Sequence, residues 1–460
     1  MTTVSSSSPS LYAARASGVA PLNNLSIEDA LQAVRLRPNV KVNIVDSVSN
    51  IKKYLGALTG IANNVATITQ DSSDTSTDTL FALTADQYAK YHKVIAKLDA
   101  GSVSYDLALS GVTAAAAITY NANARIQTIS VSDSSANIGS NIASLKGILD
   151  SNKLGTILQT GSARTIALTH ASFEANSTVL DKIGTAYNVA LSGANSAQAV
   201  GYIDNLRISS ISIADTTGGV ESNLDSLQRL GVRLKAITLN DTAVVSDDTT
   251  ATNGKIDLTA EQVKRDAIVI GKVISSYQLA VHGASLAQSL ALSKNKKVVT
   301  IDITDRGANI VKSLTMLNRL GGQLSSVTVT DSANPLSMTD AQLVTYDSLL
   351  GKFSGDYGNN VAGSSALNAT LLLAASGNYQ GAAGAHINSI AIADTSAHIS
   401  SYFAGLNDQA KLGNVTVLDQ KNAIVLTAAQ LADADSAGAD SVLADRKSTR
   451  LNSSHGYISY

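Results

Sequence analysis

Aspartate residues recur at the ends of short apolar segments throughout this chain, and they are its strongest candidates for chemistry. A first series closes segments of alternating apolar residues at Asp46, Asp133, Asp215, Asp305 and Asp394, which stand 82 to 90 residues apart. A second series closes similar segments at Asp71, Asp241, Asp331 and Asp419. The regular spacing indicates an internal repeat, so each aspartate is expected at an equivalent position in every copy.

Aspartates at the ends of neighbouring strands would lie close together, because paired strands are about 4.8 Å apart. The pairs expected are Asp46 with Asp71, Asp215 with Asp241, Asp305 with Asp331, and Asp394 with Asp419. Carboxylates at that distance repel each other unless a cation or hydrogen-bond donors compensate them. Two interpretations follow: a row of calcium sites, or carboxylates that cap helices and turns through backbone N–H groups. The sequence favours capping, with calcium as the alternative and no other cofactor expected.

Two further repeated segments predict the elements that position these aspartates. Leu-Thr-x-x-Gln and its Met variant predict capping boxes that start helices at Thr84, Thr259, Thr339 and Thr427, whereas the copy at Thr169 lacks the glutamine and predicts a weaker start. The pattern Tyr-x-Leu-Ala-Leu-x-Gly predicts a short strand stopped by glycine, with copies from residues 105, 187 and 277 and a degraded copy at 357–363.

The apolar periodicity predicts strands that alternate with helices. Ile301 and Ile303 flank Asp302 as in a half-buried strand, and a helical stripe follows at Ile310, Leu314, Leu317 and Leu320, with a similar stripe at Val220, Leu224, Leu227 and Leu230. Strands linked by helices pair in parallel, so the predicted fold class is α/β. We expect a parallel β/α solenoid, leucine-rich-repeat-like in geometry, with about five repeats of 80–90 residues and three strand-helix coils in each.

The predicted organisation has three parts. Residues 1–40 form an N-terminal tail and a capping helix that Ser26 opens and that runs through Val34, and residues 41–444 form the solenoid. Residues 445–460 break the composition of everything before them and look like a translated sequencing adapter. The natural protein is therefore expected to continue beyond residue 444.

The composition excludes several classes of protein. There are 34 Lys+Arg against 36 Asp+Glu, so no basic patch for nucleic acid is expected. No segment reaches the roughly 18 uninterrupted apolar residues of a membrane span, and the N-terminus lacks a secretory signal pattern. The chain contains 0 Cys, which excludes disulfides and thiolate chemistry. A polar, weakly charged composition favours an extracellular or cell-surface location without a cleaved signal peptide.

Other residues that could do chemistry are scattered. The six histidines, His92, His170, His282, His386, His398 and His455, show no metal-ligand or triad spacing. Aspartate-rich runs at 71–78 and 247–248 do not match a calcium loop, so solvated loops are expected. Thr238, Thr328 and Thr416 are predicted to face water from one strand position. Without a catalytic constellation, the chain is predicted not to be an enzyme.

Three sequence segments resemble those of a known group of proteins. The segments 210–215, 258–262 and 277–283 are similar to the long degenerate repeats of large bacterial surface and RTX-type proteins. That resemblance implies type I secretion and a role as an adhesin, a surface-layer component or a calcium-binding exoprotein. The Gly-rich calcium nonapeptides of RTX proteins are absent from this chain, although in that family they lie C-terminal to such repeats.

We therefore expect a non-enzymatic secreted repeat protein that acts as an adhesin, a spacer or a surface-layer-type component. Its expected partners are an extracellular glycan, a matrix or a protein surface, and self-association through the ends of the solenoid is a further expectation. The alternatives are the repeat region of a larger calcium-binding exoprotein or exoenzyme, whose catalytic part lies beyond the chain, and a phage or filament structural protein.

Overall fold

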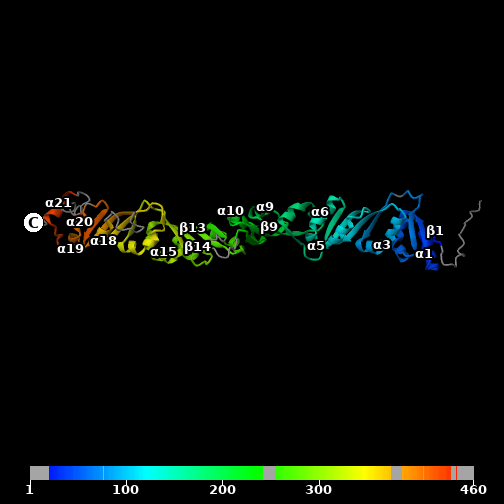
Figure 1. Cartoon of the computed structure of the whole chain (residues 1–460), viewed down its shortest axis with the longest axis horizontal. Coiled ribbons are helices and arrows are strands. Elements are labelled where there is room, and N and C mark those ends of the chain that lie inside the picture. The colour runs from blue at the N-terminus through cyan, green and yellow to red at the C-terminus, as the bar shows by residue number, and fades with distance from the viewer. Residues whose placement is uncertain are drawn as a thin grey trace, which may run out of the picture. The chain divides into compact units, whose positions relative to one another are not determined.

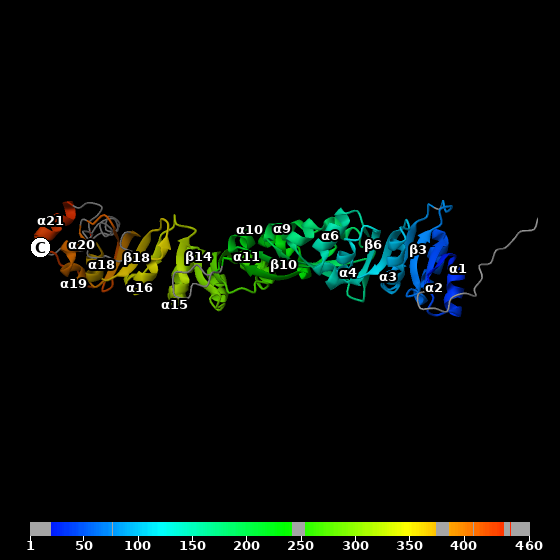
Figure 2. The same cartoon turned by 45° about the vertical axis from the view of Figure 1, so that its right-hand side comes forward.

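The computed structural model describes residues 20–75, 77–241, 254–373, 386–407, 409–436 and 442. Two compact units divide the chain: Met1–Ala214 with Leu230–Lys235, and Asp215–Arg229 with Ala236–Tyr460. In both units strands alternate with helices, and elements that follow one another in the chain are neighbours in space (Figures 1 and 2). The predicted 445–460 tail lies outside the described residues.

The first unit contains two complete parallel sheets and most of a third, with strand orders β1-β2-β3, β4-β5-β6-β7 and β8-β9-β10. Its elements are β1 (Leu22–Leu25), α1 (Ile27–Leu36), β2 (Val42–Asp46), α2 (Val48–Gly60), β3 (Val65–Gln70), β4 (Leu80–Thr84), α3 (Ala85–Ala100), β5 (Asp106–Val112), α4 (Ala114–Tyr120), β6 (Ile126–Ser134), α5 (Ser135–Ser140), α6 (Ile142–Asp150), β7 (Leu154–Thr160), β8 (Thr165–Thr169), α7 (His170–Ala175), α8 (Ser177–Leu180), β9 (Asn188–Ala194), α9 (Ser196–Gly201) and β10 (Ile208–Asp215).

The second unit has sheets in the orders β12-β13-β14-β15-β17 and β16-β18-β19-β20. The remaining elements of the chain are α10 (Thr217–Gln228), the 3-10 turn η1 (Gly231–Arg233), β11 (Leu234–Leu239), β12 (Lys255–Thr259), α11 (Ala260–Arg265), α12 (Ala267–Ile270), β13 (Gln278–Ala284), α13 (Leu286–Leu292), β14 (Val298–Asp305), α14 (Gly307–Lys312), α15 (Leu314–Leu320), η2 (Gly321–Gln323), β15 (Leu324–Val329), β16 (Leu336–Met338), α16 (Asp340–Thr345), α17 (Asp347–Leu350), β17 (Phe353–Ser354), β18 (Asn359–Ser364), α18 (Ala366–Leu373), β19 (Ile387–Asp394), α19 (Ser396–Ser401), α20 (Phe403–Leu406), β20 (Leu412–Val417) and α21 (Ala428–Ser436).

The α/β class with parallel strands is confirmed, and the core is aliphatic as the composition requires. Ile301 and Ile303 are fully buried on either side of the half-buried Asp302, so one face of the sheet packs inward. The helical stripe from Ile310 to Leu320 is also buried. It belongs to two helices, because Ser313 leaves the helical conformation at φ −112° between α14 and α15. Burying such surface is the main favourable contribution to folding.

We predicted three strand-helix coils in each repeat, but the described residues contain four strands in each of the first three intervals between strand-end aspartates and five between Asp305 and Asp394. Between Asp46 and Asp133, for example, lie β3, β4, β5 and β6. One uncounted strand, β8, follows a link without a helix, residues 161–164 after β7. Four residues are too few to cross back to a parallel neighbour in the same sheet, so β7 and β8 belong to different sheets.

The sequence pattern predicted that the glycine of the tyrosine-containing segments stops the strand. In the structure the strand continues past this glycine. Gly111 has a left-handed φ of +68°, and β5 continues to Val112. The register between β5 and β6 shifts at this point, between Leu109 and Val112, as in a β-bulge. In β1 the same left-handed conformation belongs to Asn24, at φ +60°. Glycine and asparagine tolerate that conformation better than other residues, which explains their use here.

The N-terminal helix is confirmed and is slightly longer than predicted. Ser26 caps α1 by accepting a hydrogen bond from the Asp29 amide at 3.1 Å. Strand β1, which precedes it, pairs in parallel with β2. Residues 22–36 therefore contribute a strand-helix unit to the first sheet.

Candidate functional site

The predicted site residues lie where strands end and helices begin. Asp46, Asp215, Asp305 and Asp394 are the last residues of β2, β10, β14 and β19, and Asp133 is the penultimate residue of β6. Asp71, Asp241, Asp331 and Asp419 stand in the turns that follow β3, β11, β15 and β20. The apolar strand residues before them are buried, which fixes each carboxylate at the rim of its sheet.

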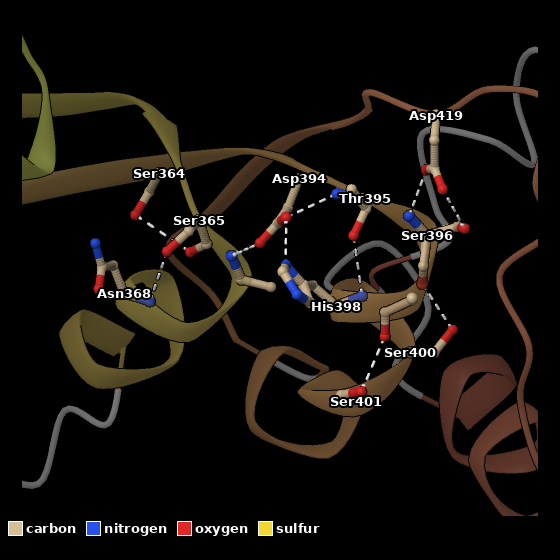
Figure 3. A network of polar contacts seen from close by, with 12 residues as sticks. Ser364, Ser365, Asn368, Asp394, Thr395, Ser396, His398, Ser400, Ser401 and Asp419 are labelled. Carbon is tan, nitrogen blue, oxygen red and sulfur yellow. Dashed lines mark hydrogen bonds and ion pairs between the residues drawn. The ribbon is translucent and has the colours of Figure 1, made fainter.

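Four carboxylates of the first series, those of Asp46, Asp133, Asp305 and Asp394, contact the helix that precedes their own strand. Figure 3 shows the arrangement at Asp394, whose Oδ2 accepts the amide of Ala366, the first residue of α18, at 2.9 Å. The equivalent bonds join Asp46 to Ile27 at 2.9 Å, Asp133 to Ala114 at 2.9 Å and Asp305 to Leu286 at 3.1 Å. The first amides of a helix have no partner within it, so these carboxylates supply one.

The other oxygen of the same carboxylate holds the start of the following helix. Asp394 Oδ1 accepts the Thr395 amide at 2.7 Å, and His398 Nδ1 lies 2.8 Å from it. Elsewhere an asparagine takes the place of the histidine: Asn50 at Asp46, Asn137 at Asp133 and Asn309 at Asp305. Asp215 Oδ1 accepts the amide of Thr216 at 2.8 Å. One aspartate therefore joins two successive helix starts.

Carboxylates of the second series accept amides at the starts of the helices that follow the first-series strands, with one exception. Asp241, Asp331 and Asp419 accept the first amides of α10, α14 and α19 at 2.9, 2.7 and 2.6 Å, from Thr217, Gly307 and Ser396. Asp71 does not take this role, because its carboxylate accepts the amide and hydroxyl of Ser73 within the turn. Asp74 replaces it, accepting the Val48 amide of α2 at 2.7 Å.

The hydrogen bonds favour the charged form of these carboxyls. Burial alone would raise the pKa of Asp133, but the Asn137 side chain and the amides of Ala114 and Ser134 outweigh it, so the pKa lies below 3.8. At Asp241, Asp305 and Asp394 hydrogen bonds likewise outweigh the effect of burial, so the pKa of each carboxyl is lowered. At Asp419 the side chain of Asn422 is the largest influence, and it lowers the pKa.

These pKa shifts predict acid sensitivity. A carboxyl with a lowered pKa in the folded state stabilises the protein above its unfolded pKa of 3.8, and this stability is lost as the pH falls through the folded value. We expect the urea midpoint to be steady above about pH 5 and to fall steeply below about pH 4. Urea titrations from neutral to acidic pH measure this. An Asp133→Asn variant, which already lacks that charge, should converge with the wild type in acid, and a constant difference would contradict the assignment.

The capping interpretation of the aspartates is thus confirmed, and calcium stays a prediction. Among the described residues, no group of three or more His, Cys, Asp or Glu side chains is placed to hold a metal ion. A cation between Asp215 and Asp241 would compete with the amides that their oxygens accept. Melting curves with millimolar calcium or with a chelator test this alternative. A calcium-dependent rise that disappears in Asp215→Asn/Asp241→Asn would establish it.

The predicted capping boxes are confirmed at Thr84, Thr259, Thr339 and Thr427. At Thr169 only half of the motif forms, since its hydroxyl accepts the Ser172 amide with no returning glutamine. Two further boxes, Asn195 with Gln198 and Ser285 with Gln288, were not predicted. Their signal, a polar residue followed three residues later by glutamine, was present two residues after the bulge glycines.

The structure also brings together three ionisable side chains whose spacing in the sequence gave no sign of a contact. His282 Nδ1 on β13 lies 2.6 Å from Asp302 Oδ2 on β14, and its Nε2 lies 3.8 Å from Asp257 Oδ1 on β12. Each comes from a different strand, so only the sheet register aligns them. The predicted outward threonines, Thr238, Thr328 and Thr416, are exposed.

The remaining candidates are dispersed. Asp78 pairs with Lys52 at 2.7 Å, while Asp247 and Asp248 lie outside the described residues. His92 Nδ1 contacts the carbonyl of Ala89, and the ring of His170 lies against Tyr202. His455 also lies outside the described residues.

The fold defines this chain as an α/β protein of parallel strand-helix units whose successive helix starts are joined by aspartates. Comparisons with protein-family models, with curated proteins and with solved structures gave no match. No described helix is both long enough and apolar enough to span a membrane.

Proposed function

We propose that this chain is a non-enzymatic, secreted repeat protein that acts as a spacer and contact surface outside the cell, as an adhesin or a surface-layer-type component does. In this proposal its strand-helix units form a β/α solenoid with leucine-rich-repeat-like geometry, exported without a cleaved N-terminal signal. Its partners are an extracellular glycan, a matrix or a protein surface.

The observation that carries the proposal is the hydrogen bond that the first amide of a helix donates to the aspartate at the end of the next strand, seen at Asp46, Asp133, Asp305 and Asp394. The amide of Ala366, for example, depends on Asp394, which the chain supplies only in the next strand. A unit of this kind leaves a helix start unsatisfied until its neighbour is in place, so it is stable only within a series. Carboxylates that hydrogen-bond neighbouring units to each other are suited to a spacer that bears load.

The sheet surface supports the contact role. Along the strands, buried apolar residues alternate with exposed polar ones, as at Val327, Thr328 and Val329. Thr328 shares a hydrogen bond with Ser354 on the adjacent strand, at 2.9 Å between hydroxyl oxygens. Rows of hydroxyls and carboxylates of this kind can donate and accept hydrogen bonds across a broad surface without forming a closed pocket.

A binding experiment with chemical analysis tests the proposal. The labelled full chain is incubated with cultured cells, immobilised glycans and matrix proteins, and both the retained protein and the released saccharides or peptides are measured. We expect retention without release of fragments. Release of products would instead support the exoenzyme alternative, and concentration-dependent growth of particles in light scattering would support a filament subunit. If the chain is not retained and does not assemble, a contact role is contradicted.

A further inference from the structure

A tyrosine just before one strand in each of four sheets has a partner beside its ring, and the fourth pair differs from the others. Arg125 lies 4.7 Å from the ring centre of Tyr105, Arg207 lies 5.1 Å from Tyr187, and Lys297 lies 3.6 Å from Tyr277. Before β18 the tyrosine is Tyr357, and its partner is the imidazole of His386, stacked at 4.0 Å and 13° from parallel. A flat, compact ring thus replaces a long flexible cation.

A second substitution removes a side chain at the same place. The residue after the tyrosine is Asp106, Asn188 or Gln278 in the other three sheets, but it is Gly358 here. A Cβ atom on Gly358 would lie only 2.0 Å from Asn388 Nδ2, so the amide of Asn388 occupies the space that a side chain would fill. A side chain at this position would force the exposed Asn388 side chain to move.

Beside these residues lies a hollow of about 370 Å³ that is open to solvent. It is lined by Tyr357 and Gly358 together with Ser332, Asp356, His386 and Asn388. Asp356 also distinguishes this sheet, since serine or alanine precedes the tyrosine in the others. Ser332, Asp356 and Asn388 are exposed, so their hydroxyl, carboxylate and amide groups are accessible to a ligand.

The hydrogen bond of His386 decides which of its ring nitrogens can contact a ligand. Nδ1 lies 3.0 Å from the carbonyl oxygen of Tyr357, which can only accept, so Nδ1 carries the proton. Nε2 of the neutral ring is then an acceptor. The hollow thus offers an aromatic ring with an acceptor nitrogen, a carboxylate, an amide that both donates and accepts, and a hydroxyl.

We propose that this hollow binds one neutral hexose residue of a glycan. The apolar C–H face of the sugar packs on the imidazole of His386, while Asp356 and Asn388 bind vicinal hydroxyls. A few convergent polar groups beside an aromatic surface are what orient a small ligand in such a site. An anionic sugar is disfavoured because Asp356 would repel it. The inference deepens the proposed function, on which it rests for a glycan partner.

Saturation-transfer difference NMR on the full chain tests the site, with glucose, galactose, mannose and N-acetylglucosamine as probes and N-acetylneuraminic acid as the anionic control. We expect transfer to at least one neutral hexose and none to the anionic sugar. Asp356→Ala should weaken binding about tenfold, because a hydrogen bond to a charged group is lost. Asn388→Ala should weaken it by a smaller factor. Gln278→Ala, at the position in β13 that corresponds to Gly358, is the matched control and should have no effect.

Two results would overturn the proposal: no transfer to any neutral hexose, or transfer that persists unchanged in the Asp356→Ala/Asn388→Ala double variant. Because both side chains are exposed, the variants should retain the wild-type melting curve, which checks that they fold. If the chain binds cells or matrix without hexose transfer, this site is wrong and the contact role stands. If it binds neither hexoses nor cells and matrix, the contact role fails as well.

Discussion

Replacing Asn359 by an apolar residue should stabilise the second unit by about 2 kcal/mol. Asn359 is fully buried at the start of β18, and neither polar atom of its amide has a hydrogen-bond partner among the residues that the structure describes. The equivalent residues, four before the bulge glycine, are Leu107, Val189 and Leu279, all of them buried. A buried amide without partners loses its hydrogen bonds to water and gains nothing in return.

Two substitutions, Asn359→Leu and Asn359→Val, test the predicted stabilisation. Two side chains of different size are used because the buried site has to accept a new shape. Urea unfolding with hydrogen exchange across β16, β18 and β19 measures the change where the residue lies. The reciprocal control, Leu279→Asn, places the same amide in β13 and should destabilise the protein by about 3 kcal/mol or more. A loss of stability in both Asn359 variants would show that the amide has a stabilising role.

The second large effect is expected from Asp133→Asn, which should cost about 2 kcal/mol. Asp133 Oδ2 accepts the amide of Ala114, and Oδ1 accepts both the Ser134 amide and the Asn137 side chain. An asparagine has one acceptor oxygen and presents an NH₂ group at the other position, so at least one helix amide is left without a partner in a buried place. Both α4 and α5 should exchange amide hydrogens faster.

Asp204→Asn is the matched control for that variant, since it removes the same charge from an exposed position of the same unit. Its effect should stay within about 0.5 kcal/mol. Equal effects from the two variants would mean that net charge, and not the helix caps, explains the loss. Chemical denaturation of both variants at neutral pH provides the comparison.

Much of the local structure follows from neighbouring residues and was predictable. The capping box at Thr259 needs only Gln262, three residues away, and the buried stripe from Ile310 to Leu320 needs only the period of a helix. The alternation around Asp302 likewise predicts a strand with one buried face. These signals act within one or two turns of chain, which is why sequence alone reveals them.

Contacts between strands depend on the register of the sheet, and sequence spacing did not reveal them. His282 meets Asp302 and Asp257 because three strands align, although the residues are 20 and 25 positions apart in the chain. The replacement of Asp71 by Asp74 as the cap of α2 depends on the path of a turn. The extra strand β8 arises because the four-residue link after β7 moves the chain into another sheet.

The sequence by itself determined the α/β class, the aliphatic core and the placing of aspartates at the strand ends, because periodicity and composition act locally and are repeated many times. Tertiary structure alone decided which helix each aspartate caps, that Asn359 is buried without partners in the described part of the chain, and that His386 and Tyr357 stack beside a hollow. The physical reason is that these features require groups from separate strands or turns, whose distances are set only when the sheets form.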